Sequence, residues 1–290
     1  MPVHNQHGLH ARPCASIVSV IAGLDAVVML RRGDRAPDEA VDGRSIMAVQ
    51  SLGVRQGDEL VATITGRQAH LAHRALAELA AKNFGDGQAE HQPDRVASTL
   101  GELPIHELQL TVPVDDYRPG TREEELARLE TALANTDGFL EGLAAKMPDQ
   151  SVTGAVLRAI RSILHDPMLA QGFRDRIAEG RSAVAAVQGT MQDAIAVFET
   201  MSNPYLRERG TDLRALQRTL LASLMETEDL SMTGVPAGHL VLVDELDAIT
   251  ASQLDPLAVP GVLTRTSGSN GHGLVVANDR GLTVHLVAAG

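Results

Sequence analysis

The chain has 290 residues, which is long enough for two or three domains, and its 44% apolar and 21% charged residues are typical of a globular protein. A net charge of −12 argues against nonspecific nucleic-acid binding, because that binding needs a basic surface. The single cysteine, Cys14, has no intrachain disulfide partner, and neither a signal peptide nor an apolar stretch of membrane-spanning length is recognisable. We therefore expect a cytoplasmic protein without membrane insertion.

Residues 1–85 are expected to form a module of their own. They contain nine Lys and Arg against eight Asp and Glu, whereas the rest of the chain contains 16 against 29, so a near-neutral module precedes an acidic one. Apolar spacing predicts a small α/β unit here. Its predicted elements are a helix at 15–22, a strand at 25–31, a short amphipathic segment at 44–52, a strand at 59–65 and a helix at 69–81.

The remaining residues are expected to form an α/β domain that is interrupted by helices. Gly, Pro and polar residues predict a linker at 86–95. Residues 121–230 have helical periodicity with breaks at Pro148, Asp166-Pro167 and Asn203-Pro204, which predicts a bundle of helical hairpins. Sheet-like segments at 96–120 and 231–290 flank the bundle, so we predict that it is inserted between two parts of one sheet domain.

His10 lies just ahead of a predicted helix. Pro13 suits the first helical position, because its φ is fixed and an N–H there would lack an intrahelical partner. Backbone N–H groups and the helix dipole favour an anion at this point, and the guanidinium of Arg12 matches phosphate oxygens. From these residues alone, His10 is either a phosphorylation site or a surface loop histidine.

The stretch "NQHGLHARPCASIV", followed by "DGRSIMAVQSLGVRQGDEL", resembles HPr, the histidine phosphocarrier of the phosphoenolpyruvate-dependent phosphotransferase system. The resemblance implies an open-faced β-sandwich of antiparallel strands and three helices. It also implies that His10 is phosphorylated and that Arg12, Pro13 and Cys14 surround the phosphoryl group. Cys14 replaces the usual alanine, and we expect its thiol to be packed rather than reactive.

The second HPr-like stretch supplies further candidate residues. By the resemblance, Ile46, Met47 and Leu52 dock partner proteins, and Ser45 falls where some HPr proteins carry a regulatory serine. A serine at the start of a short helix is more often an N-cap. The charge difference between the modules favours docking of a weakly basic surface around Arg12 on an acidic helical partner, in the same chain or in another molecule.

The acidic remainder resembles the N-terminal half of enzyme I, which phosphorylates HPr. "IRSILHDPMLAQGFRDRIAEG" matches the helices that embrace HPr in that family, and "NPYLRERGTDLRALQRTLLASL" matches its helical signature. From the residues alone, the latter is a charged amphipathic helix with Arg207 and Arg209 on the solvated face. His165 is read as a surface residue or as part of the HPr-facing helices.

The last segment, "ITASQLDPLAVPGVLTRTSGSNGHGLVVANDRGL", resembles the swivelling phosphohistidine domain of enzymes that use phosphoenolpyruvate. His272 is the matched histidine, and Gly271 lies in the Gly/Ser-rich approach that cradles phosphate. The segment departs from the family pattern at Ser267-Gly268 and Asn270-Gly271, and Asn278 stands in place of a usual arginine. No metal-ligand spacing among the histidines is convincing.

Together these parts resemble the DhaM-type multiphosphoryl transfer proteins, which feed dihydroxyacetone kinase, without their N-terminal module and without a phosphoenolpyruvate-binding barrel. We expect a fragment or a misplaced start. Enzyme I is the expected donor, and dihydroxyacetone kinase subunits or a separate mannose-type domain are the expected acceptors. No cofactor is expected besides the phosphoryl group derived from phosphoenolpyruvate. The alternatives are an enzyme I–HPr fusion for sugar uptake and a noncatalytic regulator.

Overall fold

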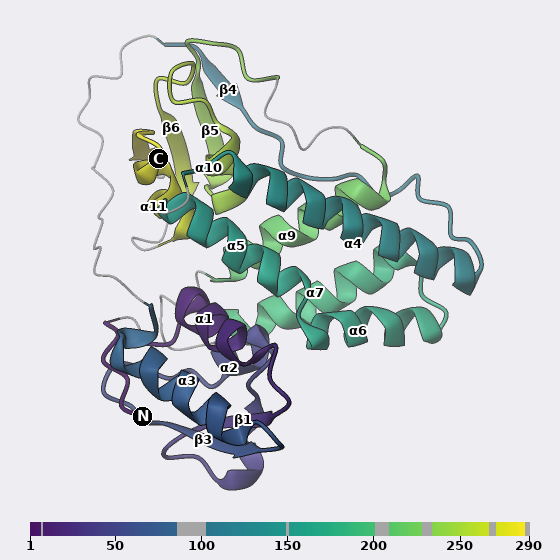
Figure 1. Cartoon of the computed structure of the whole chain (residues 1–290). Helices are drawn as coiled ribbons and strands as arrows, with labels where there is room; N and C mark the ends of the chain where they lie inside the picture. The colour runs from purple at the N-terminus through teal and green to yellow at the C-terminus, as the bar shows by residue number, and fades with distance from the viewer. Residues whose placement is uncertain are drawn as a thin grey trace.

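The structure is a computed structural model that describes residues 1–6, 8–85, 103–148, 151–200, 209–227, 234–266 and 271–287, with Ala11 and Arg12 described by their backbone only. Figure 1 shows three parts: an antiparallel module at the N-terminus, a group of long helices, and a parallel sheet near the C-terminus. The fold is therefore mixed α/β and multidomain, as the sequence predicts.

Residues 1–85 fold around an antiparallel sheet with the strand order β2, β1, β3. The elements are α1 (Ala11–Ile21), β1 (Val27–Arg32), η1 (Pro37–Glu39), β2 (Val41–Asp42), α2 (Ile46–Ser51), β3 (Leu60–Thr65), α3 (Ala69–Ala81) and η2 (Asn83–Gly85). Pro2 adds an isolated antiparallel bridge to Glu59. Helices α1 and α3 pack together over a core that includes Ile17, Leu30 and Leu76. This arrangement confirms the predicted antiparallel sheet with three helices.

Five long helices follow in the described part of the chain, and four of them begin after a capping side chain. They are α4 (Arg122–Ala145), α5 (Val152–Leu164), α6 (Pro167–Ala178), α7 (Ala183–Glu199) and α9 (Arg209–Leu224). The helices α4, α5, α6 and α7 each have an N-cap side chain that accepts a hydrogen bond from a backbone N–H of the first turn. These N-caps are Thr121, Ser151, Asp166 and Ser182. The predicted breaks at Pro148 and Asp166-Pro167 are confirmed, whereas Asn203-Pro204 lies outside the described residues.

The third part is a parallel sheet with the strand order β4, β5, β6, β7. Its elements are β4 (Ile105–Glu107), β5 (Leu240–Glu245), α10 (Ala248–Gln253), β6 (Val262–Thr266), α11 (His272–Asp279) and β7 (Val284–Leu286). Strand β4 pairs with β5 although the long helices lie between them in the sequence. The pairing predicted from segment order is therefore confirmed, and the helices form an insertion.

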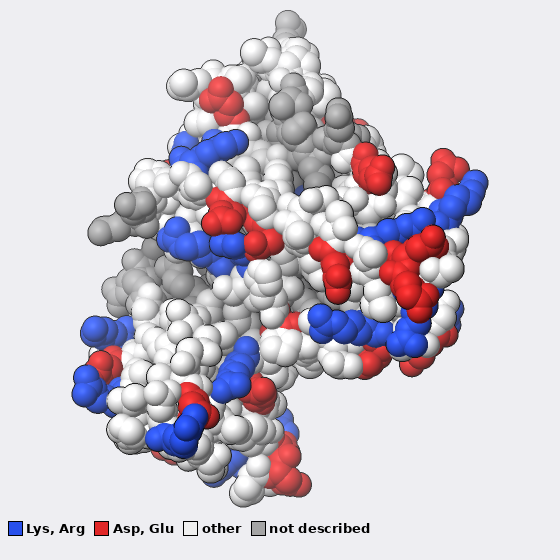
Figure 2. Space-filling view, turned by 45° about the vertical axis from the view of Figure 1, so that its right-hand side comes forward, with Lys and Arg blue, Asp and Glu red and all other residues white. Residues whose placement is uncertain are grey.

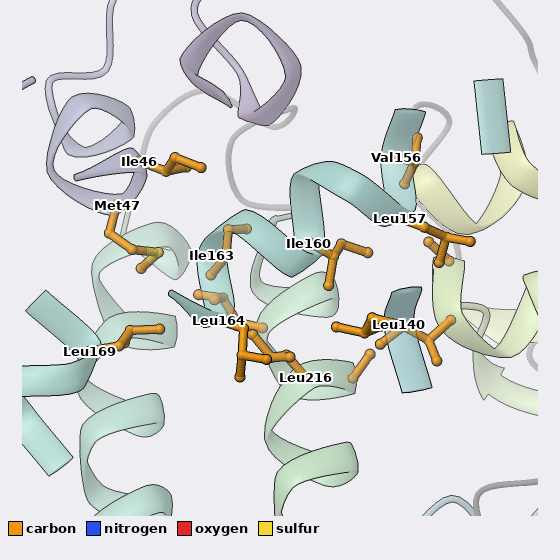
Figure 3. Packing of buried hydrophobic residues seen from close by; sticks show 14 of the residues in the cluster. Ile46, Met47, Leu140, Val156, Leu157, Ile160, Ile163, Leu164, Leu169 and Leu216 are labelled. Atoms are coloured by element: carbon orange, nitrogen blue, oxygen red, sulfur yellow. The ribbon is translucent and has the colours of Figure 1, made fainter. Parts of the chain in front are cut away.

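Helix α5 lies at the centre of the molecule. Its sequence, "VTGAVLRAIRSIL", is strongly amphipathic: eight of its residues are buried, whereas Arg158 and Ser162 are exposed. It packs against α4, against α1 and α2 of the first module, and against α10 and α11 beside the parallel sheet. In Figure 3, Ile46 and Met47 reach from α2 toward Ile163 of α5 and Leu169 of α6. The N-terminal module is thus seated on the helical part.

Three local features differ from the sequence analysis. Helix α1 begins at Ala11, so Pro13 is its third residue and His10 is itself the N-cap. Proline is tolerated there because first-turn N–H groups lack intrahelical partners. The helices α6 and α7 separate around Gly180, whose φ is +88°, a break that was not predicted. The two-residue strand β2 was too short to predict.

The surface charge is mixed. Figure 2 shows Asp and Glu side chains interspersed with Lys and Arg over the visible face of the molecule. Many of them form ion pairs on their own element or with a neighbour, such as Arg74 with Glu78 and Arg176 with Asp193. The charge asymmetry counted from the sequence is therefore not a patch of one sign on this face.

Substitution of Gly273 tests the close packing of α11 against the residues that follow β5. A Cβ atom on Gly273 would overlap the carbonyl oxygen of Leu246, so α11 lies against the chain after β5 only because residue 273 is glycine. We expect Gly273→Ala to lower the free energy of unfolding by about 2 kcal/mol. Urea denaturation measures this change.

Gly142→Ala is the matched control for that substitution. Gly142 lies in α4, and a Cβ there meets nothing within 4 Å. This variant should be more stable than the wild type by about 0.5–1 kcal/mol, because alanine favours a helix interior. Equal effects of the two substitutions would contradict the close approach at Gly273.

Candidate functional site

The first candidate site is His10 at the start of α1. His10 has the extended backbone of an N-cap (φ −91°, ψ −173°), and its exposed fraction is 3%. The backbone N–H of Cys14 donates to the His10 carbonyl at 2.9 Å and closes the first helical turn. Helix starts carry N–H groups without intrahelical partners together with the positive end of the dipole. The imidazole is therefore placed where a phosphoryl group on it would meet favourable backbone charge.

A close approach between two loops fixes the backbone ahead of His10. Gly8 has a φ of +68°, and a Cβ there would overlap the carbonyl oxygen of Val54. The Leu9 N–H donates to that same carbonyl at 3.0 Å. Glycine is the residue that tolerates both the positive φ and the contact. The loop after α2 thus holds the histidine loop in place.

The structure places the neighbours of His10 as follows. The side chain of Arg12 lies outside the described residues, and Pro13 is buried in the first turn. The Cys14 thiol is fully buried and donates to the Leu9 carbonyl at 3.5 Å. Burial raises the pKa of this thiol, although the charge of Arg209 acts in the opposite direction. Cys14 therefore behaves as a packed residue, as expected, and is not an activated thiol.

The second candidate site is His272, the first residue of α11. Gly271 is the N-cap of this helix, and the exposed fraction of His272 is 5%. The His272 Nδ1 lies 2.8 Å from the Oδ2 of Asp212 on α9. A carboxylate only accepts hydrogen bonds, so Nδ1 donates and Nε2 carries the lone pair of the neutral ring. Asp212 thus determines which ring nitrogen carries the lone pair.

Asp212 is one member of a buried charged cluster. The Arg209 guanidinium lies 3.2 Å from the same Asp212 oxygen, and both side chains are at most 3% exposed. Burial alone would raise the pKa of Asp212, but His272 and Arg209 together outweigh it and hold this pKa below its usual value. Asp212 is therefore ionised near neutral pH. The expectation that Arg209 lies on a solvated face is wrong.

Arg209 also connects the two histidine sites. Its charge acts on Cys14, one helical turn after His10, while it pairs with Asp212, the partner of His272. Helices α1 and α11 both pack against α5. The two helices that begin at the candidate histidines therefore share α5 as a neighbour, although they lie far apart in the sequence.

Two of the three predicted docking residues, Ile46 and Met47, lie against the long helices of the same chain. The exposed fractions of Ile46 and Met47 are 1% and 3%, while Leu52 is half-buried against the core. Ser45 is the N-cap of α2 and accepts from the Ala48 N–H at 3.0 Å, as expected of a serine at a helix start. Its hydroxyl also donates to the Asp166 carboxylate at 2.9 Å.

Asp166 joins two helix starts from different parts of the chain. Its carboxylate accepts from the Ser45 hydroxyl, from the Met47 N–H at 3.0 Å, and from the Met168 N–H at 2.9 Å. Burial raises the pKa of Asp166, and these hydrogen bonds offset only part of that rise. Sequence reasoning identified Asp166-Pro167 only as a helix break, and nothing in the sequence indicates the second helix that Asp166 caps.

Two general findings concern the described part of the chain. Within it, no group of three or more His, Cys, Asp and Glu side chains is arranged to hold a metal ion. Of the helices with described residues, none is both long and apolar enough to cross a membrane.

Two protein-family models match the chain. The model for the phosphorylation site of the HPr component of the phosphotransferase system covers residues 1–82, and the model for the N-terminal part of phosphoenolpyruvate-utilising enzymes covers residues 96–209. The chain therefore combines an HPr domain with the N-terminal domain of a phosphoenolpyruvate-utilising enzyme. This is the combination that the sequence motifs predict.

Individual relatives agree with this combination. The phosphoryl donor subunit DhaM of the phosphoenolpyruvate-dependent dihydroxyacetone kinase of Klebsiella michiganensis is 26% identical over 288 residues, covering 97% of this chain and 60% of its own length. The phosphoenolpyruvate-protein phosphotransferase of Haloferax volcanii is 32% identical over 160 residues, covering 54% of this chain and 28% of the relative. The chain thus spans about 60% of the length of the DhaM relative.

A solved structure is similar to part of the chain. It is the N-terminal domain of Enzyme 1-Nitrogen, with 22% sequence identity and a TM-score of 0.45, and the match covers 68% of this chain and 82% of that one.

The buried position of the Asp212 carboxylate leads to a prediction about stability and about the His272 tautomer. In Asp212→Asn, the amide no longer compensates the buried Arg209 charge, so we expect the free energy of unfolding to fall by about 3 kcal/mol. The His272 ring should also lose its fixed Nδ1–H tautomer, which nitrogen-15 NMR of the imidazole detects. Asp193→Asn is the control, because its ion pair with Arg176 lies at the surface and should contribute less than about 1 kcal/mol. An unchanged tautomer in Asp212→Asn would contradict the assigned role.

A second prediction concerns His165, which is exposed at the end of α5. Its Nε2 lies 2.6 Å from Asp137, which also pairs with Arg161. The Arg161 hydrogen bond, with His165, lowers the pKa of Asp137 to about 2. A depressed carboxyl pKa stabilises the fold above the unfolded value of about 3.9, and this contribution disappears as the pH falls toward 2.

Asp137→Asn should therefore cost about 1 kcal/mol at pH 7, after allowance for solvent screening. The difference from the wild type should vanish near pH 2, which guanidinium denaturation at several pH values measures. Glu141→Gln is the control, because Glu141 is 61% exposed and lies 3.2 Å from Arg161. A pH-independent difference for Asp137→Asn would contradict the depressed pKa.

Proposed function

We propose that the chain is a phosphohistidine carrier of the phosphotransferase system. In this proposal His10 accepts a phosphoryl group that originates from phosphoenolpyruvate and is delivered by enzyme I. The chain then passes the group to a downstream histidine, as the DhaM-like donor for dihydroxyacetone kinase. The HPr match over residues 1–82, with His10 at a helix N-cap, is the observation that carries the proposal.

The chemistry of the step fits the geometry. A neutral imidazole nitrogen attacks the phosphorus of a phosphohistidine, so one N–P bond forms and another breaks, while the acceptor ring loses a proton and the donor ring regains one. Positioning and charge stabilisation dominate such a transfer, so we propose no metal or cofactor besides the phosphoryl group. The start of α1 offers its dipole and N–H groups to the phosphoryl charge.

His272 is proposed as a second phosphoryl-bearing residue. Asp212 holds its Nδ1, so Nε2 is the nitrogen that takes the group, and the Asp212 charge stabilises the ring when it becomes cationic. Arg209 adds a buried positive charge beside the site. Within this proposal, the chain contains both ends of a histidine-to-histidine transfer, and both ends work in the cytoplasm with enzyme I as donor.

Intact-mass spectrometry tests the proposal. The chain is incubated with phosphoenolpyruvate and purified enzyme I under conditions that avoid acid, and compared with His10→Ala, His272→Ala and the exposed-site control His73→Ala. We expect phosphorylation of the wild type and of His73→Ala, and its loss in His10→Ala. A second phosphoryl group that disappears in His272→Ala supports the relay. No phosphorylation of the wild type would overturn the carrier proposal.

The acceptor is tested separately with the phosphorylated chain. We expect transfer to the dihydroxyacetone kinase subunits when a mannose-type acceptor domain is supplied. Transfer to sugar permease components instead would identify an enzyme I–HPr fusion for sugar uptake. Partner binding without any transfer would identify a regulator.

A further inference from the structure

Both candidate histidines are shielded in this structure. The exposed fractions of His10 and His272 are 3% and 5%. A protein donor or acceptor must bring its own histidine next to His10 for an in-line transfer. An outside protein has no such access while the HPr domain stays where the structure places it.

The surface that covers the HPr domain is part of the same chain. Helix α1 packs on α5, and α2 packs on α5 and α7. Ile46 and Met47, which the HPr resemblance assigns to partner docking, are already buried among Ile163, Leu164 and Leu169 (Figure 3). An apolar docking face serves one partner at a time. The helical domain therefore occupies the face that an outside partner needs.

Asp166 gives this intramolecular contact its polar specificity. Its buried carboxylate accepts from the Ser45 hydroxyl and the Met47 N–H of the HPr domain. Hydrogen bonds to an ionised carboxylate are stronger than neutral ones. When the HPr domain leaves, water must replace both bonds and the apolar contacts are lost as well.

The covalent connection favours this contact over outside competitors. A tethered partner acts at an effective concentration in the millimolar range, so even a modest interface is occupied within one chain. A separate protein at micromolar concentration has to compete with it. The balance between the two depends on the strength of the Ser45–Asp166 contact and of the apolar face beside it.

We propose that the surface formed by α5 and α6 around Asp166 binds the HPr domain of the same chain and withholds His10 from outside proteins. Transfer between His10 and His272 belongs to this closed state, and delivery from an outside donor requires the HPr domain to leave it. The second statement rests on the proposed function. The shielding does not, so it is tested without phosphoenolpyruvate or enzyme I.

Carbethoxylation by diethylpyrocarbonate measures the accessibility of each histidine in the full-length chain. Peptide mass spectrometry follows the modification of His10 over time, with the exposed His73 and His165 as internal references. We expect His10 of the wild type to react at least tenfold more slowly than His73. Equal rates would overturn the proposal.

Ser45→Asp is the variant that opens the contact. Aspartate is as good an N-cap as serine, so α2 keeps its cap, but a second carboxylate now faces Asp166 at hydrogen-bond distance. We expect the His10 rate to rise about tenfold while the His73 rate stays unchanged. Ser51→Asp is the matched control, since it adds the same charge at the exposed end of the same helix and should leave the His10 rate as in the wild type.

Asp166→Asn provides a second route to the same result. Asparagine keeps the N-cap of α6, but its amide group presents a donor where the carboxylate accepts from Ser45 and Met47. The His10 rate should rise in this variant too, and circular dichroism checks that both variants are folded. Folded variants in which His10 remains as slow as in the wild type would show that the HPr domain alone buries this histidine, and the proposal would be wrong.

Discussion

The packing of helix α5 is the constraint on which the rest of the structure depends. This helix touches α4 on one side, the HPr domain on another and α11 on a third. Eight of its residues, from Thr153 to Leu164, are buried, while Arg158 and Ser162 on its polar side are exposed. His10 is the N-cap of α1, and α11 begins with His272. The packing of α1 and α11 on α5 therefore positions both histidines relative to the same helix. The Thr153 N–H and hydroxyl also bond the Asp279 carboxylate, which ties the far end of α11 to α5.

Two buried carboxylates illustrate how the same residue type is used differently. Asp212 has cationic neighbours, so its pKa lies below the usual value and its charge is stable inside the protein. Asp166 is compensated mainly by neutral donors, and burial holds its pKa above the usual value. Separating a buried carboxylate from its cationic partners leaves uncompensated charges, which is costly. A carboxylate that accepts only from hydroxyl and N–H groups can exchange these hydrogen bonds for hydrogen bonds to water. The first therefore suits a fixed site and the second suits a contact that opens.

The sequence predicted the fold where local signals and motifs agree. The helix at 69–81 and the strand at 59–65 match within a residue, because apolar periodicity and turn residues coincide there. The start of α1 was misplaced since Pro13 fits several first-turn positions, and Gly180 was missed because a single glycine inside an amphipathic pattern is a weak break. The roles of Arg209 and Asp212 depend on a distant partner, His272, and no local pattern distinguishes a buried charged residue from a solvated one.

Arg209 is the one charge that acts on both histidine-bearing parts of the structure among the groups described above. It pairs with Asp212, the partner of His272, and its positive charge opposes the rise in the pKa of the Cys14 thiol in α1. Ion pairs weaken as the local dielectric constant rises, and the side chains of Arg209 and Asp212 are at most 3% exposed. The carboxylate that orients His272 is therefore held most firmly while this charged cluster stays buried.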